Sequence, residues 1–387
     1  MLYILIYIFL SILFYNSQRG DLKMTSKELA WCMMALSLIV GFADMLGGYD
    51  RYIYCELFDV GADTLRNKQP YFRDDNPIMG YKTEIVYVAW NYVVAHITNN
   101  RYIYILLTTL LVYLLLFKSF KDYINNYPFL LLMFMGMWFF FTFTYLRQVM
   151  AASLAWYGYR YVIQRKIWKF LILAFIVFRT HNSGIVFFVL YFIPMRRLPK
   201  QWLIYIMVVA TFIGLSGYPS SLFDAYGTVT DEQFRIRGYN EEGVFRYEYI
   251  IEAWFFLYII FSRYNRIPND VKHSVFLNAS MMFCIMLLLF CRSSNGGRLG
   301  WYFMLGALVI VSELVSYRSH RTDISIIYSV VTILFLRFVF AWGMLISPYK
   351  TFLTQGYRVG DGVHAKFEYD DNYDKNKFYR KAFDFKW

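Results

Sequence analysis

Four arginines in this sequence of 387 residues lie in or beside long apolar runs, where charged side chains are uncommon. Arg147 follows an aromatic run, Arg179 ends an apolar one, and Arg292 and Arg298 bracket a short polar segment. Arginine suits phosphate because its rigid guanidinium fork is permanently charged and offers several donors. Arginines at helix ends can instead extend to the membrane surface. If the four side chains converge, we expect them to bind a phosphate-bearing substrate.

A histidine stands in the polar cluster Arg179-Thr180-His181-Asn182-Ser183, between two apolar runs. A dense polar cluster at membrane depth is tolerated only against protein or a water-filled cavity. Near neutral pH a histidine can accept a proton from a hydroxyl group, or it can simply hydrogen-bond a substrate. The alternative is a structural histidine beside a helix break. We therefore treat His181 as a candidate catalytic base.

Several acidic residues are further candidates. Glu248 and Glu252 are four residues apart and would share one face of a helix. Asp50 and Glu84 bracket the first long polar connection. Carboxylates inside a membrane usually face the interior of the helix bundle and serve function. For Glu252 the alternative is a structural ion pair, for instance with Arg337.

The composition is that of a membrane protein. Hydrophobic residues make up 58% of the chain and charged residues 17%, against about 25% charged residues in soluble proteins. The mean hydropathy is +0.37, which with long apolar runs excludes a disordered chain, a coiled coil and a secreted disulfide scaffold. At about 20 residues per crossing, we predict an all-α polytopic integral membrane protein with about ten to twelve transmembrane helices.

The expected helices follow from the apolar runs. These lie at about 1–16, 28–46, 102–117, 127–145, 148–162, 167–180, 182–195, 201–217, 248–262, 274–291, 299–315 and 324–346. The weaker segment 84–97 is predicted to form an interfacial or re-entrant helix. The runs 167–180 and 182–195 are short for a straight crossing of about 20 residues. Either they form two half-length helices that meet at the polar cluster, or 170–192 is one crossing.

The charge pattern orients the predicted helices. The net charge is +12, and every second connection between the apolar runs is short and basic. Because basic loops prefer the cytoplasmic side, we place these connections in the cytoplasm and both termini outside. We expect one helical domain over residues 1–346, with outward loops at about 47–101 and 218–247, and a charged, aromatic tail at 347–387. The positive charge then indicates contact with the lipid bilayer, and we expect no nucleic-acid partner.

Familiar sequence motifs of soluble enzymes are missing. The chain has no Walker motif, dinucleotide glycine fingerprint, nucleophile elbow or HExxH motif, and its four cysteines lack the spacing of metal ligands. We therefore expect no metal and no cofactor.

The motifs around these residues resemble the EpsG-type branch of Wzy-like polysaccharide polymerases. The resemblance rests on Tyr-Leu-Arg-Gln-x-x-Ala over 145–151, a basic turn at 165–166 and His-Asn-Ser over 181–183. Asp50-x-x-x-Tyr54-x-x-x-Phe58 and Glu84 also fit. It covers roughly residues 30–310, and the polar pair at 179–180 and the long tail depart from it.

The resemblance implies a GT-C-like bundle in the bacterial cytoplasmic membrane with an outward-facing active site. It implies metal-independent joining of oligosaccharide repeat units carried on polyprenyl pyrophosphate, with a chain-length regulator and a flippase as further partners. An acceptor hydroxyl would attack the donor's anomeric carbon, and lipid pyrophosphate would leave.

The resemblance also distributes roles among the candidates. The residues expected to bind the pyrophosphate are Arg147, Arg179, Arg292 and Arg298. Arg147 is also expected to be catalytic, because it would stabilise the developing negative charge. His181 is the expected proton acceptor, and the alternatives are Glu84, Asp50 and Glu248. Substrate contacts are expected of Tyr54, Gln148, Asn182 and Glu252. Tyrosines such as Tyr54 would equally suit a membrane-interface belt.

Three other functions fit parts of the pattern. A flippase or transporter of lipid-linked saccharide would need cations along a cavity reaching the inner side. A membrane acyltransferase acting on sugars would use a histidine beside a cytoplasmic donor. A non-enzymatic scaffold would tolerate single arginine and histidine changes.

Overall fold

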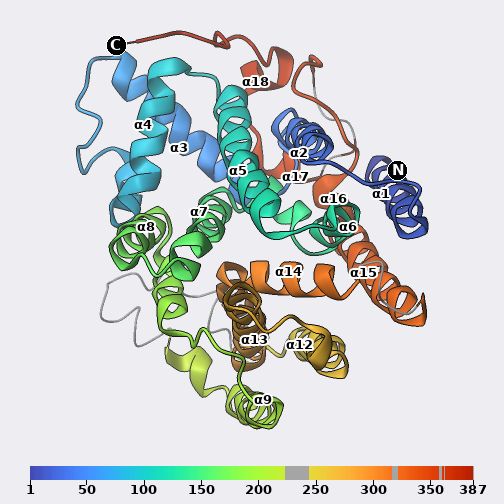
Figure 1. The fold of residues 1–387 in the computed structure, drawn as a ribbon. Helices are drawn as coiled ribbons and strands as arrows, with labels where there is room; N and C mark the ends of the chain where they lie inside the picture. Colours follow the sequence, from blue (N-terminus) through green and yellow to red (C-terminus); the bar gives the residue numbers. More distant parts are fainter. Residues whose placement is uncertain (223–243, 316–320, 357–359, 361, 387) are drawn as a thin grey trace. The chain divides into compact units, whose positions relative to one another are not determined.

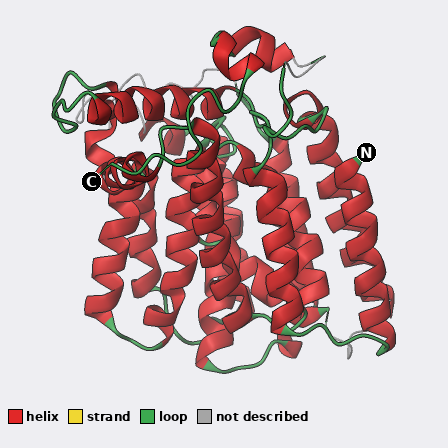
Figure 2. Ribbon diagram, turned by 90° about the horizontal axis from the view of Figure 1, so that it is seen from above, coloured by secondary structure: helices red, strands yellow, loops and turns green. Residues whose placement is uncertain are grey.

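The computed structural model describes residues 1–222, 244–315, 321–356, 360 and 362–386. Every regular element in these ranges is helical, and Figures 1 and 2 show helices and connecting loops. An isolated bridge pairs Ala43 with Thr351. The predicted all-α class is confirmed. Most of the predicted outward loop 218–247 lies outside the described residues.

The chain divides into two compact units. Unit 1 comprises Met1–Tyr157, Phe175–Asn182 and His320–Trp387, and unit 2 comprises Gly158–Ala174 and Ser183–Ser319. Unit 1 holds α1 (Leu2–Arg19), α2 (Ser26–Gly41), α3 (Tyr49–Arg66), η1 (Pro77–Glu84), α4 (Ile85–Ile97), α5 (Arg101–Tyr123), α6 (Tyr127–Met137), η2 (Phe139–Phe143), α15 (Arg321–Ala341), α16 (Gly343–Ile346), α17 (Gly362–Phe367) and α18 (Asp371–Lys375). Unit 2 holds η3 (Asn182–Phe192) from Ser183 onward, α9 (Lys200–Leu215), α12 (Tyr247–Ser262), η5 (Tyr264–Arg266), α13 (Val271–Leu289), η6 (Gly296–Tyr302) and α14 (Met304–Leu314). The helices α7 (Leu146–Ile163) and α8 (Ile167–Thr180) run through both units. The predicted boundary at residue 346 stays a prediction.

Several helices are long and apolar enough to cross a membrane. Among the described residues these are α1, α5, α13 and the Asp323–Ala341 part of α15, with η6 and α14 as a fifth if that bent pair is one span. The protein is therefore a multi-pass membrane protein. Shorter apolar helices are α6, η3 and α9, and the predicted total of ten to twelve crossings stays a prediction for such segments.

Three predicted runs are interrupted in the structure. The run 324–346 is divided between α15, which ends at Ala341, and α16, which begins at Gly343. In the run 127–145, α6 ends at Met137 and a short 3-10 helix follows before α7 begins at Leu146. In the run 299–315, η6 and α14 meet at an angle of 62°.

The structure also shows which helices form in the segments 77–97 and 167–192. In the segment 84–97, Glu84 ends η1 and residues 85–97 form α4. The 13 residues of α4 fall short of the roughly 20 needed to cross, and its location at an interface stays a prediction. Of the two alternatives for 167–195, the structure has two separate elements. Helix α8 ends at Thr180 and η3 begins at Asn182, so His181 stands at their junction.

A buried arginine fixes the start of α3. The Arg51 side chain is fully buried, and its guanidinium donates to the backbone carbonyls of Leu46 and Phe143 through Nη1 and of Val40 and Ala43 through Nη2, at 3.0–3.1 Å. These carbonyls come from the end of α2, the following loop and the end of η2. Because Phe143 leads directly into α7, Arg51 ties α3 to the helix that carries Arg147.

Glycines allow close approach of helices in unit 2. A Cβ atom on Gly306 of α14 would lie 2.4 Å from the backbone nitrogen of Ser280 in α13. A Cβ on Gly214 of α9 would lie 1.9 Å from the carbonyl oxygen of Leu288 in α13. Small residues at these points let the three helices pack backbone against backbone.

Candidate active site

A buried ion pair joins Glu84 and Arg147 in unit 1. Glu84 ends η1, and Arg147 lies in the first turn of α7. Nη1 of Arg147 donates to Oε2 of Glu84, and the two side chains are 14% and 3% exposed respectively. A charge-assisted bond at this depth holds the guanidinium in one place.

Three tyrosines surround the same guanidinium. The Arg147 Cζ atom lies 4.1 Å from the ring centroid of Tyr81, 5.3 Å from that of Tyr54 and 5.9 Å from that of Tyr87. Ring faces stabilise a cation without accepting its N–H groups. Within the described part of the chain, Nε of Arg147 is buried without a hydrogen-bond partner. The arrangement thus keeps a donor for another acceptor.

The second oxygen of Glu84 reaches the polar cluster around His181. Oε1 accepts the backbone N–H of Asn182 at 3.1 Å, and the Asn182 amide donates to the Thr83 hydroxyl at 3.2 Å. Glu84 therefore connects Arg147 with the residue next to His181. The fold thus brings positions 84, 147 and 182 together, while the catalytic role of His181 stays a prediction.

Opposing effects act on the Glu84 carboxyl. Burial alone would raise its pKa, but Arg147, His181 and the Asn182 N–H favour the ionised form and hold the pKa below the ordinary value of 4.5. Glu84 is thus a carboxylate that accepts hydrogen bonds and is a weak proton acceptor.

The other candidate site residues in unit 1 differ in how they lie relative to Glu84 and Arg147. Arg179 donates to the Lys82 carbonyl at 3.5 Å, so it lies beside η1. Tyr54 is 5% exposed and faces Arg147, which differs from a residue of an interface belt. Gln148 is buried, and Asp50 is half-buried in the first turn of α3 with its charge acting on Tyr54.

The remaining candidates belong to unit 2. Arg292 is exposed, whereas Arg298, Glu248 and Glu252 are half-buried. Nη1 of Arg246 lies 3.9 Å from Oε1 of Glu248. Because these residues and Arg147 belong to different units, the predicted convergence of four arginines stays a prediction.

Comparison with known protein families shows to which family this chain belongs. A family model described as the EpsG family matches residues 28–352. The chain belongs to the EpsG family. No curated protein and no solved structure matches it. The EpsG match spans the Arg147 cluster and ends before α17, and membership supports a general role as a polysaccharide polymerase.

Sequence reasoning missed several residues of this EpsG-family site. Tyr81, Tyr87 and Thr83 contact Arg147 or Asn182, and Arg51 fixes the helix that carries Tyr54. The Tyr81–Tyr87 segment held a usable signal, because aromatic residues flank Glu84 on both sides. For Arg51, the signal was a Gly47-Gly48 pair, typical of a sharp turn, with a basic residue three positions after it.

Proposed function

We propose that this EpsG-family protein joins oligosaccharide repeat units carried on polyprenyl pyrophosphate, by glycosyl transfer on the extracytoplasmic face of the bacterial cytoplasmic membrane. One observation carries the proposal. Arg147 keeps its charge in a tyrosine cage, with a buried nitrogen donor unpartnered among the described residues, next to the segment that contains His181.

The reaction needs charge stabilisation and one proton transfer. The acceptor oxygen bonds to the anomeric carbon while the bond from that carbon to the pyrophosphate oxygen breaks. The electron pair leaves on the lipid pyrophosphate, where Arg147 stabilises the growing negative charge. The hydroxyl proton passes to His181. Arg179, Arg292 and Arg298 are further candidates for the pyrophosphate.

Glu84 has a different task in this proposal. Its carboxylate is ionised and is occupied by Arg147 and the Asn182 N–H. We therefore assign it to orient Arg147 and the His181 segment. Asp50 and Glu248 remain the alternatives to His181 as base, and Tyr54, Gln148, Asn182 and Glu252 remain candidates for substrate contacts.

Complementation of a gene deletion tests the function. Cells would receive wild type, Arg147→Ala, Arg147→Lys or His181→Ala, with Arg19→Ala as the control because Arg19 is an exposed arginine at the end of α1. Surface polysaccharide is then resolved by size, and lipid-linked intermediates are quantified at equal protein level.

The expected result is a collapse from a polymer ladder to single repeat units, with lipid-linked units accumulating. Losing one such electrostatic donor typically lowers a rate by about 10²- to 10³-fold. Unchanged polymer length and amount in both Arg147→Ala and His181→Ala would contradict the site. Loss of every surface sugar, single units included, would indicate transport instead of polymerisation.

A further inference from the structure

The C-terminal segment 362–386, which we call the strap, lies beyond the matched family range and yet is partly buried in unit 1. Tyr373 and Lys377 are 0% exposed, Asp374 is 2% exposed and His364 is 6% exposed. Buried charges at the end of a chain are costly unless they are paired. Figure 1 shows this segment, in red, passing the start of α5 and ending near α4.

The strap inserts a lysine beneath the start of α5. Nζ of Lys377 lies 3.2 Å from Oδ1 of Asp44, with both side chains at most 1% exposed. The Tyr102 hydroxyl donates to the same oxygen at 3.1 Å. The Asn100 amide donates to the carbonyls of Lys377 and Arg380, both at 2.9 Å. The strap backbone is thus fixed to the N-terminal cap of α5.

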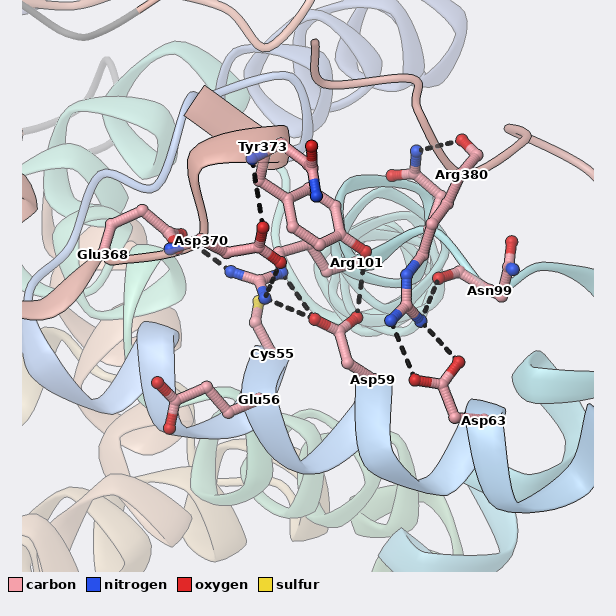
Figure 3. Close-up of polar contacts among 12 residues, drawn as sticks. Cys55, Glu56, Asp59, Asp63, Asn99, Arg101, Glu368, Asp370, Tyr373 and Arg380 are labelled. Atoms are coloured by element: carbon pink, nitrogen blue, oxygen red, sulfur yellow. Dashed lines mark hydrogen bonds and ion pairs between the residues drawn. The ribbon is translucent and has the colours of Figure 1, made fainter. Parts of the chain in front are cut away.

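A second group of contacts joins the strap to α3 and α5 together, as Figure 3 shows. Arg101 binds Asp59 of α3 and, at 2.7 Å, Glu368 of the segment, and its guanidinium lies 3.8 Å from the ring centroid of Tyr373. The Tyr373 hydroxyl donates to Asp59 at 3.2 Å. Arg380 donates to both oxygens of Asp63, at 2.9 and 2.8 Å.

The last residues of the strap extend these contacts to α4. Nε of Arg66 donates to the Asp384 carboxylate at 3.1 Å. The backbone N–H of Asp384 donates to the Ile97 carbonyl at 3.0 Å, and that of Lys386 to the His96 carbonyl at 2.8 Å. The strap therefore connects three helices of unit 1 that all flank the candidate site.

Helix α3 presents two different faces to these neighbours. The strap contacts come from residues spaced by four and three, which form one stripe: Tyr52, Glu56, Asp59, Asp63 and Arg66. Tyr54 lies about 200° around the helix from Tyr52, at 100° per residue, and contacts Arg147. Phe58 shares the face of Tyr54 and stacks on Tyr104.

We propose that the strap positions α3, so that Arg380 acts through α3 and Tyr54 as a positioning residue for the Arg147 site, while Lys377 anchors the strap at Asp44 and the start of α5. The effect on polymerisation rests on the proposed function, whereas the effect on α3 does not. Since α3 is one rigid element, a force on its Asp63 face moves its Tyr54 face.

A charge exchange tests the strap. The variants are Arg380→Asp, Asp63→Arg and the double variant that restores the pair in reverse, with Lys375→Glu as control because Lys375 is an exposed strap lysine. Backbone hydrogen exchange of residues 49–66 and 371–386 is measured on purified full-length protein, and polymer length is measured in complemented cells.

We expect Arg380→Asp and Asp63→Arg to speed exchange in both segments by about tenfold, as loss of a charge-assisted pair would, and to shorten the polymer. The double variant restores both readouts and Lys375→Glu changes neither. Release of the strap with unchanged exchange in α3 would overturn the proposal, as would fast exchange of the strap in wild type. Failure of the proposed site shows separately, as unaltered polymer in both Arg147→Ala and His181→Ala. In that case the exchange of α3 still decides whether the strap positions this helix.

Discussion

One oxygen of the Glu84 carboxylate binds the guanidinium of Arg147, 63 residues further along the chain. The other oxygen accepts the backbone N–H of Asn182. A single buried carboxylate thus joins the start of α7 to the junction that holds His181. The geometry makes Glu84 a residue that organises the site.

Replacing Glu84 by Gln tests this role. The amide keeps the size of the side chain but leaves Arg147 without its counter-charge, so the guanidinium loses its fixed position. We expect polymer yield at equal protein level to fall about 10- to 100-fold, since misplacement of a catalytic group by about 1 Å costs on that order. Surface polysaccharide from complemented cells measures it. Wild-type yield from Glu84→Gln would contradict an organising role.

The depressed pKa of Glu84 predicts a pH dependence of stability. A carboxyl whose pKa in the folded state lies below 4.5 contributes stability that is complete above that value and is lost as the pH falls through the folded pKa. We expect the contribution of Glu84 ionisation to the melting temperature of the detergent-solubilised protein to be complete and independent of pH between about pH 6 and pH 8, well above 4.5. Below that range, the fall should be shallower in Glu84→Gln than in wild type.

The tyrosine cage can be tested at its closest member. Tyr81→Phe keeps the ring over Arg147, whereas Tyr81→Leu removes it at similar bulk. Cation–π contacts contribute about 0.5 to 2 kcal/mol, so Tyr81→Leu should lower polymer yield by about 2- to 30-fold and Tyr81→Phe should keep most of it. Equal yields from the two variants would show that the ring face is unimportant.

Arg51 should be required for stability more than for chemistry. Removing its guanidinium leaves four buried backbone carbonyls with fewer donors, and each unsatisfied group costs about 1 to 3 kcal/mol. We expect Arg51→Met to lower the amount of folded protein in membranes strongly, and Arg51→Lys to restore only part of it because an ammonium cannot span the same carbonyls. Arg19→Met is the matched control, and detergent-stable protein is quantified by size-exclusion chromatography.

Close packing in unit 2 gives a further stability prediction. Gly306→Ala places a methyl group 2.4 Å from a backbone nitrogen of α13, so α13 and α14 must separate. Overpacking of this kind costs about 1 to 3 kcal/mol, and the melting temperature should fall. Gly343→Ala is the control, because a Cβ there has no atom within 4 Å. Equal melting temperatures would mean that the helices do not depend on this contact.

Much of the architecture could be predicted from local sequence. Apolar runs indicated the long helices except α3, which lies in the segment 47–101 that was expected to be a loop. The polar cluster at 179–183 allowed for the break between α8 and η3 as one of two alternatives. The resemblance to the EpsG family could also be seen in short motifs, and the family match confirms it. Hydropathy and capping act over one or two helical turns, so they are readable from consecutive residues.

The partners within the site depended on tertiary structure. Glu84 was a candidate base by its position, and only the fold paired it with Arg147 and brought Tyr81 over the guanidinium. The tail had no assigned role until the fold placed Lys377 against Asp44. Sequence alone determined the helices, the membrane class and the charged residues available. Three-dimensional packing decided which of those charged residues form pairs. Buried charges pair with residues that are close in space, and the sequence around each one has no local pattern that identifies its partner.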